Sequence, residues 1–281
     1  MATPLRLPAP AKLNLMLHVT GRRDDGYHLL QSVFQFVDLC DWLEFESTAD
    51  NALVRLGDSP VPEETDLVMR AARLLQQAGG ADKGAKIRVD KQIPMGGGLG
   101  GGSSDAATCL LALNHLWGLE LPLDRLAELG LELGADVPVF VKGCAAWAGG
   151  VGELLEPVDL DEAIYVIIDP AVSVSTAEIF AAEELTRNCD PITIRAFLRG
   201  AGTNVCETVV SGRYPEVGAA LDWLRQYGNA RMSGTGGCVF VEVDSLRQAE
   251  IVKSRVPKPW EGYIARSMNR HPLHQQLGLL D

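Results

Sequence analysis

The sequence predicts an α+β protein built in two lobes. Segments with the two-residue period of strands are interspersed with segments of helical period along the whole chain. Its 281 residues exceed one typical domain, so one large or two fused domains are expected. We expect an N-terminal lobe over 1–155, a C-terminal lobe over 156–281, and a functional site in the cleft between them.

Composition and charge narrow the function. A hydrophobic content of 47% with 22% charged residues is typical of a globular protein with a full core. The net charge of −12 disfavours general binding to nucleic acid or to an anionic membrane. The six cysteines form no Cys-x-x-Cys pair, which favours free thiols over a metal site or disulfides. With neither a leader sequence nor a membrane-length apolar run, we expect a cytoplasmic protein. A monomer or weak homodimer is expected.

The first half is expected to begin with two long strands. Residues 1–10 are proline-rich and extended, and the strand over 11–19 follows. Its alternation places two sets of side chains on opposite faces: Leu13, Leu15, Leu17 and Val19 against Lys12, Asn14, Met16 and His18. The other elements expected in this half are strands over 29–46, 52–56 and 85–93, helices over 65–78, 105–117 and 123–133, and a hairpin over 144–158.

The second half is expected to hold strands and mostly short helices. The strands are expected over 164–170, 239–243 and 262–267, and the helices over 190–198, 204–210, 214–227 and 245–255, with another beginning at Ser175. A glycine turn over 233–238 precedes the second of these strands, and the tail from Met268 carries no clear signal.

A glycine-rich tract over 94–107 is the feature around which the first half is organised. Six of the seven residues 96–102 are glycine, which allows backbone angles closed to other residues and close approach to a ligand. Ser103 and Ser104 are expected to cap the helix that follows, so that its unpaired N–H groups face one point, which suits a phosphate. No lysine precedes Ser103, which excludes a P-loop, and the context does not fit a dinucleotide-binding unit. A plain glycine-rich turn is the alternative.

The tract resembles the central ATP-binding motif of the GHMP kinases, the family named after galactokinase, homoserine kinase, mevalonate kinase and phosphomevalonate kinase. The matching residues are Pro94, Met95, Gly96, Gly97, Gly98, Leu99, Gly100, Gly101, Gly102, Ser103 and Ser104. Pro10–Leu15 is similar to the first motif of that family, and Ser233–Phe240 to the third. The resemblance covers nearly the whole chain. It implies the two-lobe GHMP kinase fold, with a ribosomal-protein-like β/α N-terminal lobe, and ATP held by residues 94–104 together with Mg²⁺.

The resemblance also implies a catalytic pair. Read alone, Asp136 in Gly134–Pro138 would be a helix cap and Lys12 a solvated lysine. The family segment similar to Gly134–Pro138 carries an aspartate that faces the substrate hydroxyl, which implies that Asp136 is the catalytic base. Lys12 would lie near Asp136, keep it ionised and attract the γ-phosphate, and Asn14 would orient these groups.

Further residues are similar to one branch of the family, which phosphorylates the 2-hydroxyl of a cytidine diphosphate-linked methylerythritol in the non-mevalonate route to isoprenoid precursors. Gly26-Tyr27-His28 carries this likeness. It implies that Tyr27 stacks on the cytosine, that His28 hydrogen-bonds the base, and that Phe180 closes over the other side. Thr176 matches a polar substrate contact. Asp66 stands where that branch has an asparagine near the adenine, so no adenine contact is assigned to it.

Other functions stay open. A sister kinase acting on homoserine or a mevalonate would share the ATP motifs, but it would leave Tyr27, His28 and Phe180 without a role. A non-catalytic nucleotide-binding protein on the same fold would tolerate loss of Lys12 and Asp136, which are both present in motif context. A nucleic-acid binder is opposed by the acidic balance.

Overall fold

The computed structural model describes residues 4–59 and 61–279 and confirms an α+β architecture. Within these residues the strands are β1 (Leu5–Arg22), β2 (His28–Thr48), β3 (Leu53–Leu56), β4 (Gly84–Asp90), β5 (Ala146–Gly149), β6 (Leu154–Pro157), β7 (Ile164–Asp169), β8 (Arg231–Met232), β9 (Val239–Val243) and β10 (Glu261–Met268). The helices are α1 (Leu67–Gly79), α2 (Gly101–Trp117), α3 (Leu123–Leu133), α4 (Val137–Lys142), α5 (Thr176–Ala181), α6 (Ile194–Phe197), α7 (Cys206–Arg213), α8 (Pro215–Leu224), α9 (Leu246–Ser254) and α10 (Pro272–Gln276).

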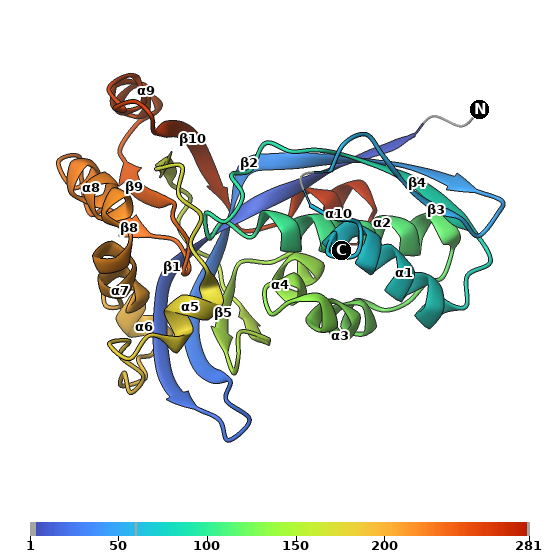
Figure 1. The fold of residues 1–281 in the computed structure, drawn as a ribbon, viewed down its shortest axis with the longest axis horizontal. Coiled ribbons are helices and arrows are strands. Elements are labelled where there is room, and N and C mark those ends of the chain that lie inside the picture. The colour runs from blue at the N-terminus through green and yellow to red at the C-terminus, as the bar shows by residue number, and fades with distance from the viewer. Residues whose placement is uncertain (1–3, 60, 280–281) are drawn as a thin grey trace.

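The long antiparallel pair β1 and β2 runs through both halves of the molecule (Figure 1). The connected strands follow the order β3-β4-β2-β10-β7-β9-β8; β1 and β5 also pair with β2, and β6 pairs with β5. Only β3 and β4 run parallel among the described pairs. Helices α1 to α4 lie on one side of the view and α5 to α9 on the other, so that each half of the β1–β2 pair serves a different lobe.

The core divides into three clusters. One lies among α1 to α4 and their strands, including Phe45, Leu75, Leu110 and Phe140. A second lies among α5 to α9, including Val166, Ile179, Leu221 and Val241. A third joins them beneath the glycine-rich tract, including Leu13, Val37, Leu99 and Phe240. Because Leu99 is buried in this joining cluster, the tract is fixed at the boundary between the two halves.

The alternation expected in the first strand is interrupted. The pairing register of β1 with β2 shifts between Asn14 and Met16, which marks a bulge or irregularity at Leu15. Met16 is buried in the same cluster as Leu13 and Leu15, instead of being set against them by strict alternation. Lys12 and Asn14 precede the shift, and their side chains meet as the pattern predicts.

Most expected helices are present, with differences at their ends. The helix over 123–133 is confirmed as α3, and α1 is capped by Asp66 and ends at Gly80. The segment expected over 190–198 is helical only over Ile194–Phe197. Helices α4 and α10 went unpredicted because each is only six or five residues long, with proline in its first turn and too few positions to show a period.

The C-terminal end returns to the first half of the molecule. Helix α10 follows Met268, and its Leu273 is buried in the same cluster as Phe140. The division at residue 155 therefore stays a prediction about the lobes. Residues 1–3 of the extended start lie outside the described residues. No helix among residues 4–59 and 61–279 has both the length and the apolar character needed to span a membrane.

Candidate active site

The glycine-rich tract packs backbone to backbone against the second glycine turn. Gly96, Gly98 and Gly100 all have positive φ, between 71° and 77°, a conformation that favours glycine. A Cβ added to Gly98 would lie 2.1 Å from the carbonyl oxygen of Ser233, and one added to Gly236 would lie 2.1 Å from the Gly98 nitrogen. The glycines of both turns are thus required by their close approach, which the sequence motifs alone did not specify.

Helix α2 begins directly from the tract, one turn earlier than expected. Its N-cap is Gly100, with no side-chain cap, so the prediction that Ser103 and Ser104 cap the helix is wrong. The glycines at 101 and 102 extend the helix backward and place both serines in its first turn. Ser104 is buried, whereas Ser103 lines two cavities. The N-terminal N–H groups and the positive end of the helix dipole therefore remain available to an anion.

Lys12 and Asp136 form an ion pair beside the glycine-rich tract. The Lys12 Nζ lies 3.2 Å from Asp136 Oδ2 and donates a hydrogen bond to the Gly98 carbonyl at 3.1 Å. Lys12 is buried in β1, whereas Asp136 is partly exposed just before α4. The Asp136 carboxylate makes no cap hydrogen bond to α4, so the simple cap interpretation fails. Its oxygens are open to a ligand on one side and held by an ammonium on the other.

Asn14 ties this pair to both glycine turns. Its Oδ1 accepts a hydrogen bond from the Lys12 ammonium, and its Nδ2 donates to Ser32 Oγ at 2.8 Å. The backbone N–H of Asn14 donates to Ser233 Oγ at 3.2 Å, and that hydroxyl donates to the Gly98 carbonyl at 3.0 Å. Each polar group here is satisfied, so the network fixes the position of the Lys12 ammonium. Sequence reasoning identified Asn14 but missed Ser32 and Ser233 as its partners.

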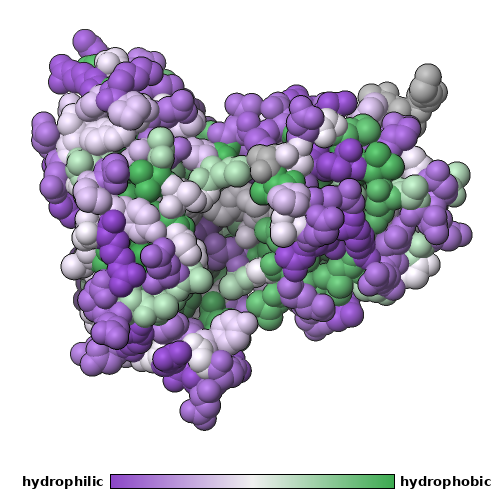
Figure 2. All heavy atoms as spheres, in the orientation of Figure 1, coloured by the Kyte–Doolittle hydropathy of each residue, from purple (hydrophilic) through white to green (hydrophobic). Residues whose placement is uncertain are grey.

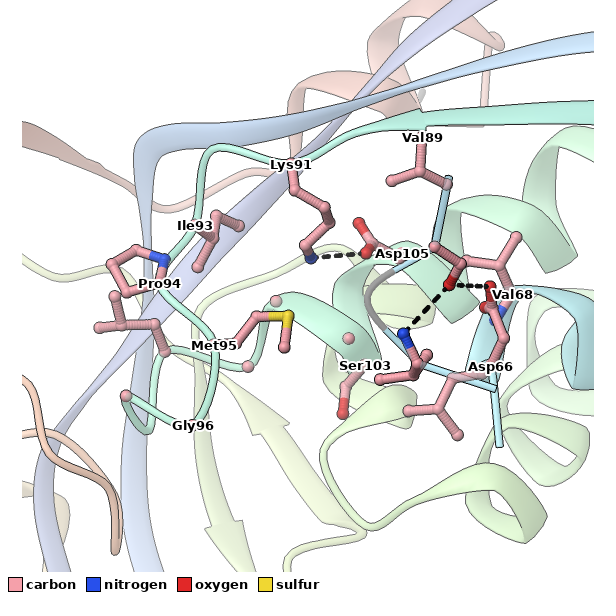
Figure 3. A pocket seen from close by; sticks show the side chains of 18 of the residues that line it. Asp66, Val68, Val89, Lys91, Ile93, Pro94, Met95, Gly96, Ser103 and Asp105 are labelled. Atoms are coloured by element: carbon pink, nitrogen blue, oxygen red, sulfur yellow. Dashed lines mark hydrogen bonds and ion pairs between the residues drawn. The ribbon is translucent and has the colours of Figure 1, made fainter. Parts of the chain in front are cut away.

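A first cavity, called here the loop cavity, lies between the glycine tract and α1. It has a volume of about 360 Å³ and is lined by residues 93–103, Arg55, Asp66, Lys91 and Asp105, among others (Figure 3). The Lys91 ammonium bonds Asp105 at 2.8 Å and also contacts Asp41. Burial, and secondarily the nearby Asp41 carboxylate, raise the pKa of Asp105 to about 7, although Lys91 opposes this rise. Sequence analysis missed this group of Lys91, Asp41 and Asp105. The signal that could have found it was Asp41, a charged residue within the apolar run of a long strand.

Asp66 is occupied by protein contacts. Its Oδ1 accepts the N–H of Val68 at 2.9 Å, and its Oδ2 accepts Arg55 Nε at 3.1 Å, with both side chains largely buried. Both carboxylate oxygens are therefore engaged, one as a helix cap and one in an ion pair. This agrees with assigning no adenine contact to this side chain.

A second cavity, called here the cleft cavity, opens between the two halves. It has a volume of about 750 Å³, and its lining includes Lys12, Tyr27, His28, Asp136, Thr176 and Phe180. Figure 2 shows the molecular surface hollowed between the two halves. Gly98, Gly100 and Ser103 line both cavities, so the glycine tract forms the shared wall. All sequence-predicted site residues except Asn14 line one of the two cavities or, as with Ser104, adjoin a residue that does.

The aromatic residues of the cleft cavity differ from a simple sandwich. The rings of His28 and Phe180 stack with centroids 5.1 Å apart and an interplanar angle of 22°. Tyr27 is 65% exposed, and so keeps a free aromatic face at the cavity. The Thr176 hydroxyl shares a hydrogen bond of 2.7 Å with the Thr235 hydroxyl of the second glycine turn. A base held between Tyr27 and Phe180 stays a prediction.

The residues present fit a magnesium ion carried by a nucleotide. Among the described residues no three His, Cys, Asp or Glu side chains gather as a metal site. Mg²⁺ in phosphate-transferring sites keeps several waters and takes one or two carboxylates together with phosphate oxygens. Asp136 offers one such open carboxylate beside the phosphate-type loop. A resident metal cage is therefore not needed for the ion to bind here.

Comparison with known proteins shows which family the chain resembles. The family model for the GHMP kinases N terminal domain matches residues 66–144, and the model for the GHMP kinases C terminal matches residues 177–262. The 4-diphosphocytidyl-2-C-methyl-D-erythritol kinase of Nitrosococcus oceani is 59% identical over 93% of this chain and 94% of its own length. The one from Thiobacillus denitrificans is 56% identical, with 95% and 96% covered.

Solved structures agree on the fold. A crystal structure of 4-(cytidine 5'-diphospho)-2C-methyl-D-erythritol kinase matches with a TM-score of 0.82 and 33% identity, covering 94% of this chain and 99% of that one. The mevalonate kinase of Methanococcus jannaschii matches with a TM-score of 0.69 at 16% identity, covering 95% and 99%. The second likeness concerns the fold alone, and together they confirm the predicted two-lobe architecture.

Proposed function

The chain belongs to the GHMP kinase family, and from that premise we propose that it transfers the γ-phosphoryl group of ATP to the 2-hydroxyl of 4-diphosphocytidyl-2-C-methyl-D-erythritol. One observation carries the proposal. The Lys12–Asp136 pair lies in the cleft cavity, whose wall is shared with a phosphate-type glycine loop. The relatives named for this substrate support its choice, and with it a place in the non-mevalonate isoprenoid route.

The glycine tract supplies the phosphate site. Backbone N–H groups of residues 96–104 and the N-terminal end of α2 attract the ATP phosphates without a lysine in the loop. The loop cavity takes the rest of the nucleotide, with the Lys91 ammonium on its wall. Mg²⁺ would neutralise phosphate charge as part of MgATP, held mainly by phosphate oxygens and water, which leaves Asp136 open to the acceptor hydroxyl.

Asp136 acts as the base for the acceptor hydroxyl. Phosphoryl transfer depends mainly on positioning and on electrostatic stabilisation of the phosphate oxygens. The open carboxylate of Asp136 can accept the hydroxyl proton. Its ion-pair partner Lys12 offsets negative charge on the phosphoryl group that is transferred. Asn14 keeps the Lys12 ammonium in place through its own two-sided network.

The other end of the cleft cavity recognises the base. The free face of Tyr27 stacks on one side of the cytosine, and Phe180, whose ring also stacks on His28, closes over the other side. The His28 imidazole provides a hydrogen bond to the base. Thr176 adds a polar contact near the second glycine turn. A homoserine or mevalonate substrate would leave Tyr27, His28 and Phe180 without a role, which favours the cytidyl substrate.

The proposal also covers the lobe boundary, the oligomeric state and the cellular location. The division into lobes at residue 155, a monomer or weak homodimer, and a cytoplasmic location belong to the same hypothesis. The six cysteines are all free thiols, which suits a reducing compartment.

An ADP-release assay with MgATP tests the function directly. 4-Diphosphocytidyl-2-C-methyl-D-erythritol, homoserine and mevalonate are offered separately, and turnover is expected with the first alone. CMP is added as a competitor, because only a pocket that reads cytidine responds to it. Turnover with homoserine or mevalonate would keep the kinase and reject the base pocket. No ADP release with any of the three substrates, in protein that binds ATP, would favour a non-catalytic nucleotide-binding protein.

A further inference from the structure

Arg187 lies behind the base-recognition end of the cleft cavity, although it does not line the cavity. It comes from the irregular segment 182–193 that follows α5, and its side chain is partly buried. Its Nε donates a hydrogen bond to His28 Nε2 at 3.1 Å. Because a guanidinium carries donors and no acceptor, the direction of this bond is fixed. His28 Nε2 must present its lone pair, which leaves the proton of the neutral imidazole on Nδ1.

The rest of the guanidinium ties Arg187 to the end of α5. One terminal nitrogen donates to the carbonyls of Phe180 at 2.9 Å and Ala182 at 2.6 Å, and the other donates to Leu185 at 3.1 Å. The same side chain therefore holds the backbone that carries Phe180 and the ring that stacks on it. Within the described residues Arg187 forms no ion pair, since the nearby Glu184 is paired with Arg213. Its guanidinium hydrogen bonds thus go to the His28 ring and to the backbone carbonyls at and after the end of α5.

The charges around His28 favour the neutral ring. Arg22 at the end of β1 and Asp25 in the turn that follows line the same cavity, and Asp25 is paired with Arg23. Helix α5 contributes the uncharged Phe180, and segment 182–193 contributes Arg187. Burial first, then Arg187 and Arg22, lower the pKa of His28 below its ordinary value. The ring therefore stays neutral at physiological pH, with one donor and one acceptor.

We propose that Arg187 is a positioning residue that fixes His28 with its proton on Nδ1, and that this fixed donor makes the pocket prefer cytosine over uracil. The inference rests on the proposed function and deepens it. No described residue accepts a hydrogen bond from His28 Nδ1, so this atom is free for a ligand. Cytosine presents an unprotonated ring nitrogen, N3, that accepts from such a donor. Uracil carries a hydrogen on N3, so its N3–H would face the His28 Nδ1–H and neither donor would find an acceptor.

The tautomer can be measured in the unmodified protein. In a ¹⁵N spectrum of histidine-labelled enzyme, His28 should show a protonated Nδ1 and an unprotonated Nε2 from about pH 6 to about pH 8. The His28→Gln variant assigns the signals among the five histidines. A proton on Nε2 would overturn the proposal, and so would titration with an ordinary histidine pKa. This measurement needs no variant of Arg187 and holds even if that variant folds poorly.

Binding selectivity tests the consequence. In the ADP-release assay, CMP should inhibit the wild-type enzyme more strongly than UMP. In Arg187→Met the ratio of the two inhibition constants should fall by about tenfold, as expected when a fixed donor is lost. The KM for the cytidyl substrate should rise more than kcat falls. It should also become pH-dependent in the mildly acidic range, because removing the cation raises the His28 pKa.

Arg213→Met is the matched control. Arg213 pairs with Glu184 in the same neighbourhood but does not touch His28, so its loss should leave the CMP preference unchanged. An Arg187→Met enzyme with the wild-type preference would overturn the role of Arg187 alone. A wild-type enzyme that ignores CMP and the cytidyl substrate would instead overturn the proposed function, and this inference with it.

Discussion

Two lysine–aspartate groups flank the same glycine tract, and they are built in opposite ways. In the cleft cavity Lys12 is 3% exposed and its partner Asp136 is 36% exposed. In the loop cavity Lys91 is 25% exposed, whereas its partners Asp41 and Asp105 are 0% and 6% exposed. One group offers an open carboxylate backed by a buried cation. The other offers a reachable cation backed by buried carboxylates.

The difference indicates how charge is divided between the two cavities. An open carboxylate can exchange a proton with a ligand, which suits the acceptor side of the reaction. A reachable ammonium can only donate hydrogen bonds and offset negative charge, which suits the nucleotide side. Asp41 also accepts the backbone N–H of Ile93 at 2.8 Å, so the second group anchors the start of the glycine tract. We therefore expect chemistry from the first group and positioning from the second.

Neutralising one aspartate of each group should give the largest contrast. Asp136→Asn should lower kcat by about 10³-fold, within the range for loss of a general base. Asp105→Asn should retain kcat to within about tenfold, because Asp105 faces the nucleotide side and accepts no substrate proton. The ADP-release assay measures both, and calorimetry should show ATP binding to Asp136→Asn. Equal losses of kcat in the two variants would remove the distinction.

Replacing each lysine should affect stability in the opposite order: the group in the loop cavity should lose more free energy of unfolding than the group in the cleft cavity. Lys91→Met leaves the buried Asp41 carboxylate and the ionised fraction of Asp105 uncompensated, which should lower the free energy of unfolding at pH 7 by about 3 kcal/mol. Lys12→Met leaves the partly exposed Asp136 and the neutral acceptor Asn14 Oδ1 without their ammonium partner, but no fully buried charge, so its cost should be smaller. Urea denaturation of both variants gives the comparison. The double variant Lys91→Met/Asp105→Asn should recover part of the loss, and a further loss would show that the carboxylates are not what Lys91 compensates.

Sequence patterns found the first group because its residues lie within short local motifs. Lys12 and Asn14 share one strand, and Asp136 lies in a five-residue segment with a family likeness. The second group joins residues 50 positions apart: Asp41 lies within β2, whereas Lys91 directly follows β4. Arg187 and His28 lie 159 positions apart, and Arg187 comes from a segment with no period. Such partners are brought together by tertiary packing, which a local pattern does not encode.

The same limit explains the errors in local structure. Helical period identified α2 but not its first residue, because glycines at 101 and 102 carry no side chain to mark a face. The serines expected as caps lie within the first turn as a result. The register shift near Leu15 depends on pairing with β2, which strand alternation cannot report. Elements with long periodic patterns were predictable, whereas their ends and irregularities depended on the partner elements.

The smallest expected effect is on the pH dependence of stability, to which the buried Asp105 of the second group should contribute. The pKa of Asp105 is raised to about 7 in the folded protein, above its ordinary value of 3.8. Between these values the folded protein binds the proton more tightly than the unfolded chain, so Asp105 makes stability fall as the pH rises. Asp105→Asn removes this term. Its melting temperature should match that of the wild type near pH 4 and exceed it by on the order of 5 °C at pH 7. Because both proteins share every other titrating group, including the buried histidines, the difference between their melting curves reports Asp105 together with its interaction with Lys91 and Asp41. A difference that stays constant with pH would mean that Lys91 keeps Asp105 ionised throughout, and the second group would then be an ordinary buried ion pair.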